Sequence, residues 1–172
     1  HFDDKSLLGW AYFNRARIFD FKNDADSTEF YYEKALPYFE TSGDKVGVSF
    51  CLNNMASIYE EWEQYEKANQ FYRKAYHAKI ALLNVEGNTV ADYGYSLSKS
   101  CSGIGNTEYL LSNYDSAITA YTRGIWWADQ VGSLESKTYA VSLQTDMARV
   151  YKKRGQYGLA SELYADQVNR YL

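Results

Sequence analysis

The chain has 172 residues, of which 46% are apolar, 23% are charged and only one is proline. It is long enough to form a domain with a buried core, and too apolar to be a disordered segment. The net charge of −4 argues against a nucleic-acid-binding surface, because phosphate binding needs a clustered excess of Lys and Arg.

No apolar run approaches the length of a membrane span or a signal peptide, so we expect a soluble segment without direct membrane contact. The first residue is His1, and we therefore expect a fragment of a larger protein whose targeting segment is not visible here. The compartment, cytoplasmic or periplasmic, stays open.

In chain order, a glycine followed by a helix-capping residue recurs at a nearly constant interval. Glycine tolerates the left-handed conformation that ends a helix, and Asp, Asn or Ser accepts a hydrogen bond from the amides that begin the next one. These pairs are Gly43-Asp44, Gly87-Asn88 and Gly132-Ser133, and turns are expected between them at Asn23-Asp24, Glu63-Gln64, Ser112-Asn113 and Gly155-Gln156. The sequence predicts eight antiparallel helices of about 18 to 22 residues. They pair into four repeats at approximately 4–43, 44–87, 88–132 and 133–172 of a single domain, 1–172.

Three segments depart from a uniform pattern. Pro37 lies inside the second predicted helix and predicts a kink or an early end, because proline removes a backbone hydrogen bond. The region 80–98 is longer than its counterparts and predicts extra helical turns or a longer loop. Trp126 and Trp127 are adjacent, so one should face the neighbouring helix while the other is partly exposed. The pair indicates either a wide buried face between repeats or an exposed tryptophan that binds a partner.

The clearest sequence signal is a pattern of large and small residues that returns along the chain. In the second repeat Val48, Cys51, Leu52, Met55 and Ile58 form an apolar stripe at helical spacing. The pattern Met55, Ala56, Tyr59, Tyr65, Ala68, Tyr72 and Ala75 recurs as Met147, Ala148, Tyr151, Tyr157, Ala160, Tyr164 and Gln167. A third copy has Ile104, Gly105, Tyr114, Ala117, Tyr121 and Gly124, and a degraded first copy has Ala16, Phe19, Tyr32 and Ala35.

This pattern resembles the tetratricopeptide repeat, in a long form of about 40 to 45 residues like that of bacterial signalling regulators. The resemblance covers nearly all of the chain and departs at Arg15 and Thr28 in the first copy and at Glu108 in the third. It implies an all-α fold, a right-handed superhelical α-solenoid. The core residues of the pattern should be structural, and Gly105 should let the paired helix come close.

The sequence contains no catalytic, cofactor-binding or metal-binding constellation. His77 has no nearby partner in sequence, and Gly103-Ile104-Gly105 lacks both the third glycine and the preceding strand of a phosphate-binding loop. Cys51 and Cys101 lack metal-ligand spacing. Buried free thiols are the preferred interpretation, and a bridge between neighbouring repeats is the alternative. We expect no enzyme activity and no cofactor.

The resemblance implies that the first helices of successive repeats line a concave groove that binds a protein or peptide. The eighteen tyrosines suit either such a surface or partly wet helix seams. The expected groove residues are Trp10, Phe13, Arg17, Phe21, Phe50, Asn53, Ser57, Glu60, Glu61, Lys99, Ser102, Asn106, Tyr109, Thr145, Arg149, Lys152 and Lys153.

Two charge clusters bear on this groove. Lys152, Lys153 and Arg154 lie at a predicted helix C-terminus, where the helix dipole favours cations, so a solvated cap explains them. Glu60 and Glu61 lie at another helix C-terminus, where the dipole disfavours anions, so local energetics do not explain them. A ligand-facing role in the groove is the alternative to a solvated helix end. The carboxylate clamp of tetratricopeptide co-chaperones is incomplete, because Phe13, Arg17 and Gly103 occupy three of its positions.

These observations predict a non-enzymatic protein- or peptide-binding module, the recognition or sensor region of a larger regulatory protein. The alternative is a structural scaffold or oligomerisation domain that stacks through its end repeats into a homo-oligomer. A third possibility is an activator that inserts a groove residue into a partner's active site.

Overall fold

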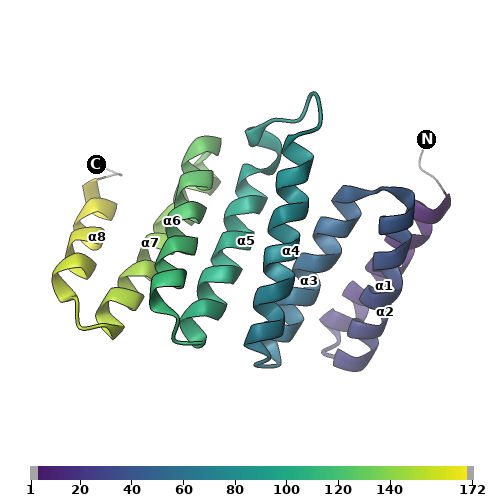
Figure 1. Ribbon diagram of the computed structural model, residues 1–172, viewed down its shortest axis with the longest axis horizontal. Coiled ribbons are helices and arrows are strands. Elements are labelled where there is room, and N and C mark those ends of the chain that lie inside the picture. The colour runs from purple at the N-terminus through teal and green to yellow at the C-terminus, as the bar shows by residue number, and fades with distance from the viewer. Residues whose placement is uncertain (1–3, 170–172) are drawn as a thin grey trace. The chain divides into compact units, whose positions relative to one another are not determined.

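The computed structural model describes residues 4–169, and every regular element in this range is an α-helix. The helices are α1 (Asp4–Phe21), α2 (Ala25–Ser42), α3 (Lys45–Glu61), α4 (Tyr65–Leu83), α5 (Val90–Leu110), α6 (Tyr114–Val131), α7 (Leu134–Lys153) and α8 (Tyr157–Asn169). The two helices of each pair run antiparallel (Figure 1). The described residues therefore confirm the predicted all-α architecture of helix-turn-helix repeats.

The helices belong to two compact units of two repeats each. Unit 1 ends at Asn84 and contains α1 to α4, and unit 2 begins at Val85 and contains α5 to α8. The boundary lies within the 80–98 region. There, α4 ends at Leu83 and α5 begins at Val90 and extends for 21 residues, so this region has both the longer connection and the extra helical turns.

The turn inside each repeat has one geometry in all four copies. A residue in the left-handed conformation follows the first helix: Asn23, Glu63, Ser112 or Gly155, with φ between 56° and 73°. The next amide then donates to the carbonyl five residues earlier, as from Gln64 N to Tyr59 O at 2.8 Å. This bond satisfies a carbonyl that the helix end would leave open. The four turns predicted from sequence are confirmed.

The connections between repeats within a unit use glycine and an N-cap side chain. Gly43 and Gly132 both have φ of 70°, and Asp44 accepts a hydrogen bond from Gly47 N at 2.8 Å. Ser133 caps α7 in the same way by accepting from Ser136 N at 3.1 Å. These two predicted helix starts are confirmed.

The predicted cap at Asn88 is wrong, because Thr89 is the N-cap of α5. Asp92, three residues after Thr89, accepts hydrogen bonds from the Thr89 amide at 2.7 Å and from its hydroxyl at 2.8 Å. The contact from the Thr89 amide is one half of a capping box, and the Thr89 side chain, facing the Asp92 amide, provides the other half. Counting from Asn88, the third residue is Ala91, which has no acceptor.

Helix α2 continues past Pro37 to Ser42, so the alternative of an early end at Pro37 is wrong. Packing on both sides of the proline explains this. Ala35 and Phe39 are completely buried, and burying a Phe side chain stabilises by about 1.5 to 3 kcal/mol. That gain is comparable to the cost of about 3 kcal/mol for proline in a helix interior.

The Phe39 ring occupies space that two glycines leave open, one on each side. A Cβ atom on Gly9 of α1 would lie 2.7 Å from the ring, and one on Gly47 of α3 would also overlap it. Phe39 thus joins three helices of unit 1, because the ring of α2 reaches between the backbones of α1 and α3.

The residues of the predicted core pattern are buried wherever another helix packs against them. Met55, Tyr59, Ala68, Tyr72 and Ala75 all have less than 7% of their surface exposed. In unit 2 the core cluster consists of Ala117, Tyr121, Leu143, Met147 and Val150. The main exceptions are Tyr157 and Tyr164 of α8, which are 68% and 39% exposed. The counterparts of Tyr164, which are Tyr32, Tyr72 and Tyr121, are buried.

Gly105 and the tryptophan pair behave as predicted in unit 2. A Cβ atom on Gly105 would lie 2.5 Å from the ring of Tyr121, so the glycine makes room for this side chain of the paired helix α6. Trp127 is 8% exposed, whereas Trp126 is 51% exposed.

Candidate functional site: the first-helix faces of each unit

In unit 1 the expected groove residues begin with an aromatic cluster around Trp10. Its ring packs edge-on against Phe13, Phe39 and Phe50, with centroids 5.1 to 6.2 Å apart. Its indole N–H donates to the Asp44 carboxylate at 2.9 Å, which ties α1 to the cap of α3. Phe13 is buried in this cluster, and only Phe50 offers a large exposed surface. We therefore leave Phe13 out of the proposed binding surface.

Two polar residues of the α3 face are hydrogen-bonded to the second helix of their own repeat. Asn53 accepts from Lys79 at 3.2 Å, and Glu60 accepts from the Tyr72 hydroxyl at 2.7 Å. Burial raises the pKa of Glu60, and the Tyr72 hydrogen bond partly offsets this by stabilising the charged form. Glu60 therefore has a structural partner, which local sequence energetics did not reveal.

The remaining candidates of unit 1 are more accessible. Phe21 is 91% exposed at the end of α1, Arg17 is exposed one turn before it, and Ser57 is half-buried on α3. Glu61 is exposed, at the last position of α3. These four residues are available to a partner.

In unit 2 the residues Tyr95, Lys99, Ser102, Asn106 and Tyr109 follow one face of α5 at steps of four and three. The Lys99 ammonium lies 4.6 Å from the centroid of the Tyr95 ring, a cation–π contact. Asn106 accepts from the Tyr121 hydroxyl at 2.7 Å. Ser102 is buried, so we also leave it out of the proposed binding surface.

Helix α7 presents a basic series of candidates at its C-terminal half. Arg149 is exposed, pairs with Asp146 and lies 5.6 Å from the centroid of the Tyr109 ring on α5. The Thr145 hydroxyl accepts from Gln167 of α8 at 3.1 Å. Lys152 and Lys153 are exposed in the last turn of α7, where the helix dipole favours cations.

A shallow depression between the N-terminal halves of α5 and α7 escaped the sequence analysis. Its lining consists of Tyr95, Leu134, Glu135, Thr138, Tyr139 and Ser142. The Tyr95 and Tyr139 rings meet edge-on at 5.4 Å, and Leu134 is 78% exposed. Burial raises the pKa of Tyr95, and the Glu135 carboxylate beside it acts in the same direction. Extending the Lys99 and Thr145 series one or two turns toward the helix N-termini would have found Tyr95, Thr138 and Ser142.

Within residues 4–169 no three His, Cys, Asp or Glu side chains are grouped to hold a metal ion. Cys51 and Cys101 are buried thiols outside any disulfide, as preferred from sequence, and His77 is exposed. Within this same range, no helix combines the length and apolar character needed to cross a membrane.

Comparison with known proteins agrees with the helical-repeat fold. The tetratricopeptide repeat family model matches residues 51–78, which span most of α3 and α4. No curated protein matches the sequence significantly.

Two solved structures are similar in fold. BtubC (BKLC) from P. vanneervenii is 19% identical, with a TM-score of 0.80 over 97% of this chain and 64% of that one. The apo form of RapI is 14% identical, with a TM-score of 0.81 over 96% of this chain and 43% of that one. The chain thus spans less than two thirds of the length of either structure.

Proposed function

Because the chain contains a tetratricopeptide repeat, we propose that it is a non-enzymatic module that binds a protein or peptide through the first-helix faces of its repeats. The observation that carries the proposal is the α5–α7 depression, where Tyr95, Tyr139 and the exposed Leu134 lie together. Exposed apolar and aromatic side chains beside cations are typical of peptide-binding surfaces.

The charges near this depression suggest the kind of peptide that it would accept. Lys99 and Arg149 lie on the same helix faces, and Lys152 and Lys153 continue the series on α7. Glu135 lines the depression and lies in the first turn of α7, at the other end of the helix from Lys152 and Lys153. An extended peptide with an apolar segment followed by acidic residues would match this order.

The test is selection from a peptide display library, followed by titration of the selected peptides against variants. Leu134→Ala combined with Lys99→Glu should weaken binding at least tenfold, and both side chains are exposed, so folding should be preserved. Trp126→Ala removes an exposed aromatic from α6 and is the matched control. If only the control weakens binding, the partner uses α6 and the proposed face is wrong.

At a finer level, we propose that the module is the recognition region of a larger regulatory protein. Both similar structures are longer than this chain, which is compatible with additional segments in a full protein. A full-length product that joins this region to a kinase or DNA-binding domain would support the regulatory role. A full product built only of repeats would contradict it.

The second candidate function, an oligomerisation scaffold, is favoured by the exposed face of α8. Tyr157, Tyr164 and Val168 are exposed there at helical spacing, whereas the equivalents of Tyr164 are covered. Light scattering across a concentration series tests this candidate. A dimer that Tyr164→Glu dissociates would support it, and a monomer at all concentrations would refute it.

A further inference from the structure

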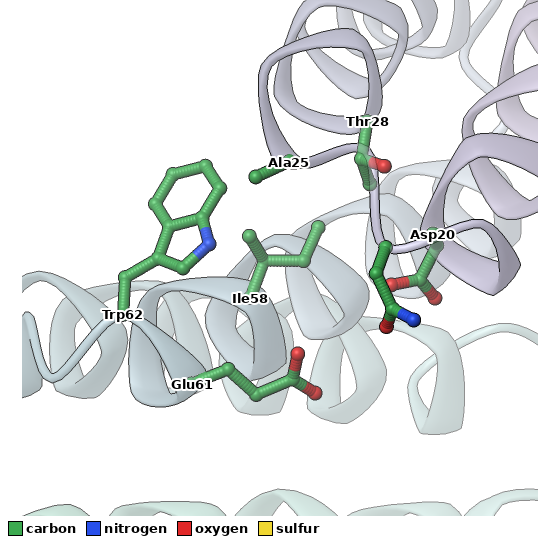
Figure 2. Close-up of a pocket in the computed structure, with 7 residues that line it drawn as sticks. Asp20, Ala25, Thr28, Ile58, Glu61 and Trp62 are labelled. Atoms are coloured by element: carbon green, nitrogen blue, oxygen red, sulfur yellow. The ribbon is translucent and has the colours of Figure 1, made fainter.

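Unit 1 contains a small cavity that shares only Glu61 with the candidate residues of the first-helix faces. It lies between the turn that joins α1 to α2 and the last turn of α3, and it has a volume of about 200 Å³. Ile58 lies between the Trp62 indole and Asp20, with the Glu61 carboxylate close by (Figure 2). The volume suits one long side chain rather than a folded segment.

The two carboxylates of this cavity form no ion pair with the described residues. Neither Asp20 nor Glu61 accepts a side-chain hydrogen bond or forms an ion pair there, and Lys22, the closest Lys in sequence, lies over the Phe19 ring. Asp20 and Glu61 also lie in the last turns of α1 and α3, where the helix dipoles are negative. The cavity therefore gathers negative potential from four sources.

The Tyr32 hydroxyl of the same repeat supports this interpretation. In the second repeat the equivalent Tyr72 hydroxyl donates to Glu60, and Asp20 is the counterpart of Glu60. The Tyr32 side chain is completely buried, yet its hydroxyl has no hydrogen-bond partner. Asp20 thus does not take the structural role of Glu60, and its carboxylate lines the cavity instead.

Unit 2 shows that an acidic cavity does not follow from the repeat geometry alone. The equivalent residues are Tyr109 for Asp20, Tyr114 for Ala25, Lys153 for Glu61 and Arg154 for Trp62. The Tyr109 and Tyr114 rings, 6.0 Å apart, pack against the core of unit 2, and Arg154 pairs with Asp115. The same junction is thus filled by aromatic rings and carries positive charge.

We propose that the unit 1 cavity binds the protonated side chain of a lysine or arginine of a protein partner. The charged end would lie between Asp20 and Glu61, whose carboxylates would accept its hydrogen bonds, and the Trp62 ring would face the apolar part of the side chain. The stem would lie against Ile58 and Ala25. The protein partner rests on the proposed function, whereas the chemistry of the cavity does not.

The first test uses small probes on the whole chain and follows the Trp62 indole resonance by NMR, assigned with Trp62→Phe. N-acetyl-lysine amide and N-acetyl-arginine amide should shift this resonance saturably, and N-acetyl-norleucine amide, which lacks the charge, should bind at least tenfold more weakly. Equal binding of the norleucine compound would overturn the proposal. Tighter binding of spermidine than of any lysine peptide would assign the cavity to free polyamines and overturn the protein partner.

The second test removes the charges. Asp20→Asn with Glu61→Gln should weaken lysine amide binding at least tenfold. Glu33→Gln with Glu40→Gln, which removes the same charge from exposed positions of α2, should change it less than twofold. If both double variants weaken lysine amide binding equally, the effect comes from overall charge and the specific site is refuted.

Selected peptides separate this inference from the proposed function. If peptides bind and depend on Leu134 but not on Asp20, Glu61 or any basic residue of the peptide, the cavity proposal fails alone. If the lysine probe binds and no selected peptide does, the proposed function and the protein partner fail, and the cation site remains.

Discussion

Gly105→Ala tests whether the close packing of α5 and α6 limits the stability of unit 2. A Cβ atom at this position would lie 2.5 to 2.8 Å from three atoms of the Tyr121 ring, which is 1% exposed. The ring has no free space, and its hydroxyl is held by Asn106 at 2.7 Å. The added methyl group must therefore displace a buried side chain.

The opposing contributions can be compared. Alanine gains about 1 kcal/mol over glycine in helix propensity. Overpacking costs about 1 to 3 kcal/mol, and losing the hydrogen bond from Tyr121 to Asn106 costs about 0.5 to 1.5 kcal/mol more. We expect a net loss of about 0.5 to 3.5 kcal/mol in the free energy of unfolding, whereas helix propensity alone would predict a gain.

Urea unfolding followed by circular dichroism measures this difference, with Gly158→Ala as the matched control. Gly158 is also helical, but a Cβ atom added there would meet no neighbouring atom within 4 Å, so alanine should be neutral or stabilise by about 0.5 kcal/mol. If Gly105→Ala proves as stable as the parent chain while Gly158→Ala behaves as expected, the steric reasoning is wrong.

Three further predictions concern single side chains. Asp44→Ala should lower the free energy of unfolding by about 1 to 2 kcal/mol, because α3 loses its cap, and chemical denaturation would detect this. Tyr32→Phe should be neutral or stabilising, since the hydroxyl it removes is buried without a partner, whereas Tyr121→Phe should cost about 1 kcal/mol; equal effects would contradict the hydrogen-bond assignment. Burial, followed by the charge of Glu40, raises the pKa of Cys51 to about 12. Because the native thiol stays protonated where the unfolded one ionises, stability should fall as pH rises from about 9 toward 12, and Cys51→Ala should reduce this slope.

Local sequence chemistry was sufficient to predict the turns inside the repeats. Turns such as Glu63-Gln64 depend on a left-handed residue and a helix end, both of which are encoded within a few neighbouring residues. The one cap that was misplaced, Asn88 instead of Thr89, was decided by Asp92, again a local partner. The apolar stripe around Met55 likewise identified buried residues correctly, because helical spacing fixes which side chains share a face.

The partners of polar residues on the first-helix faces could not be predicted in this way. Asn53 and Glu60 are bonded to residues of the next helix, so their roles depend on how two helices pack rather than on spacing within one. Phe13 shares a face with exposed residues but is covered by Trp10 and Phe39. Tyr95 was missed because tyrosine suits core and surface equally.

The ring of Phe39 between Gly9 and Gly47 has a consequence for how unit 1 opens. Repeat arrays commonly fray one repeat at a time, since each repeat contacts only its neighbours. Here α1 cannot detach without uncovering a ring that α3 also holds. The amide protons of α1 and α3 should therefore exchange with solvent through one shared opening, which makes the first two repeats a single cooperative unit.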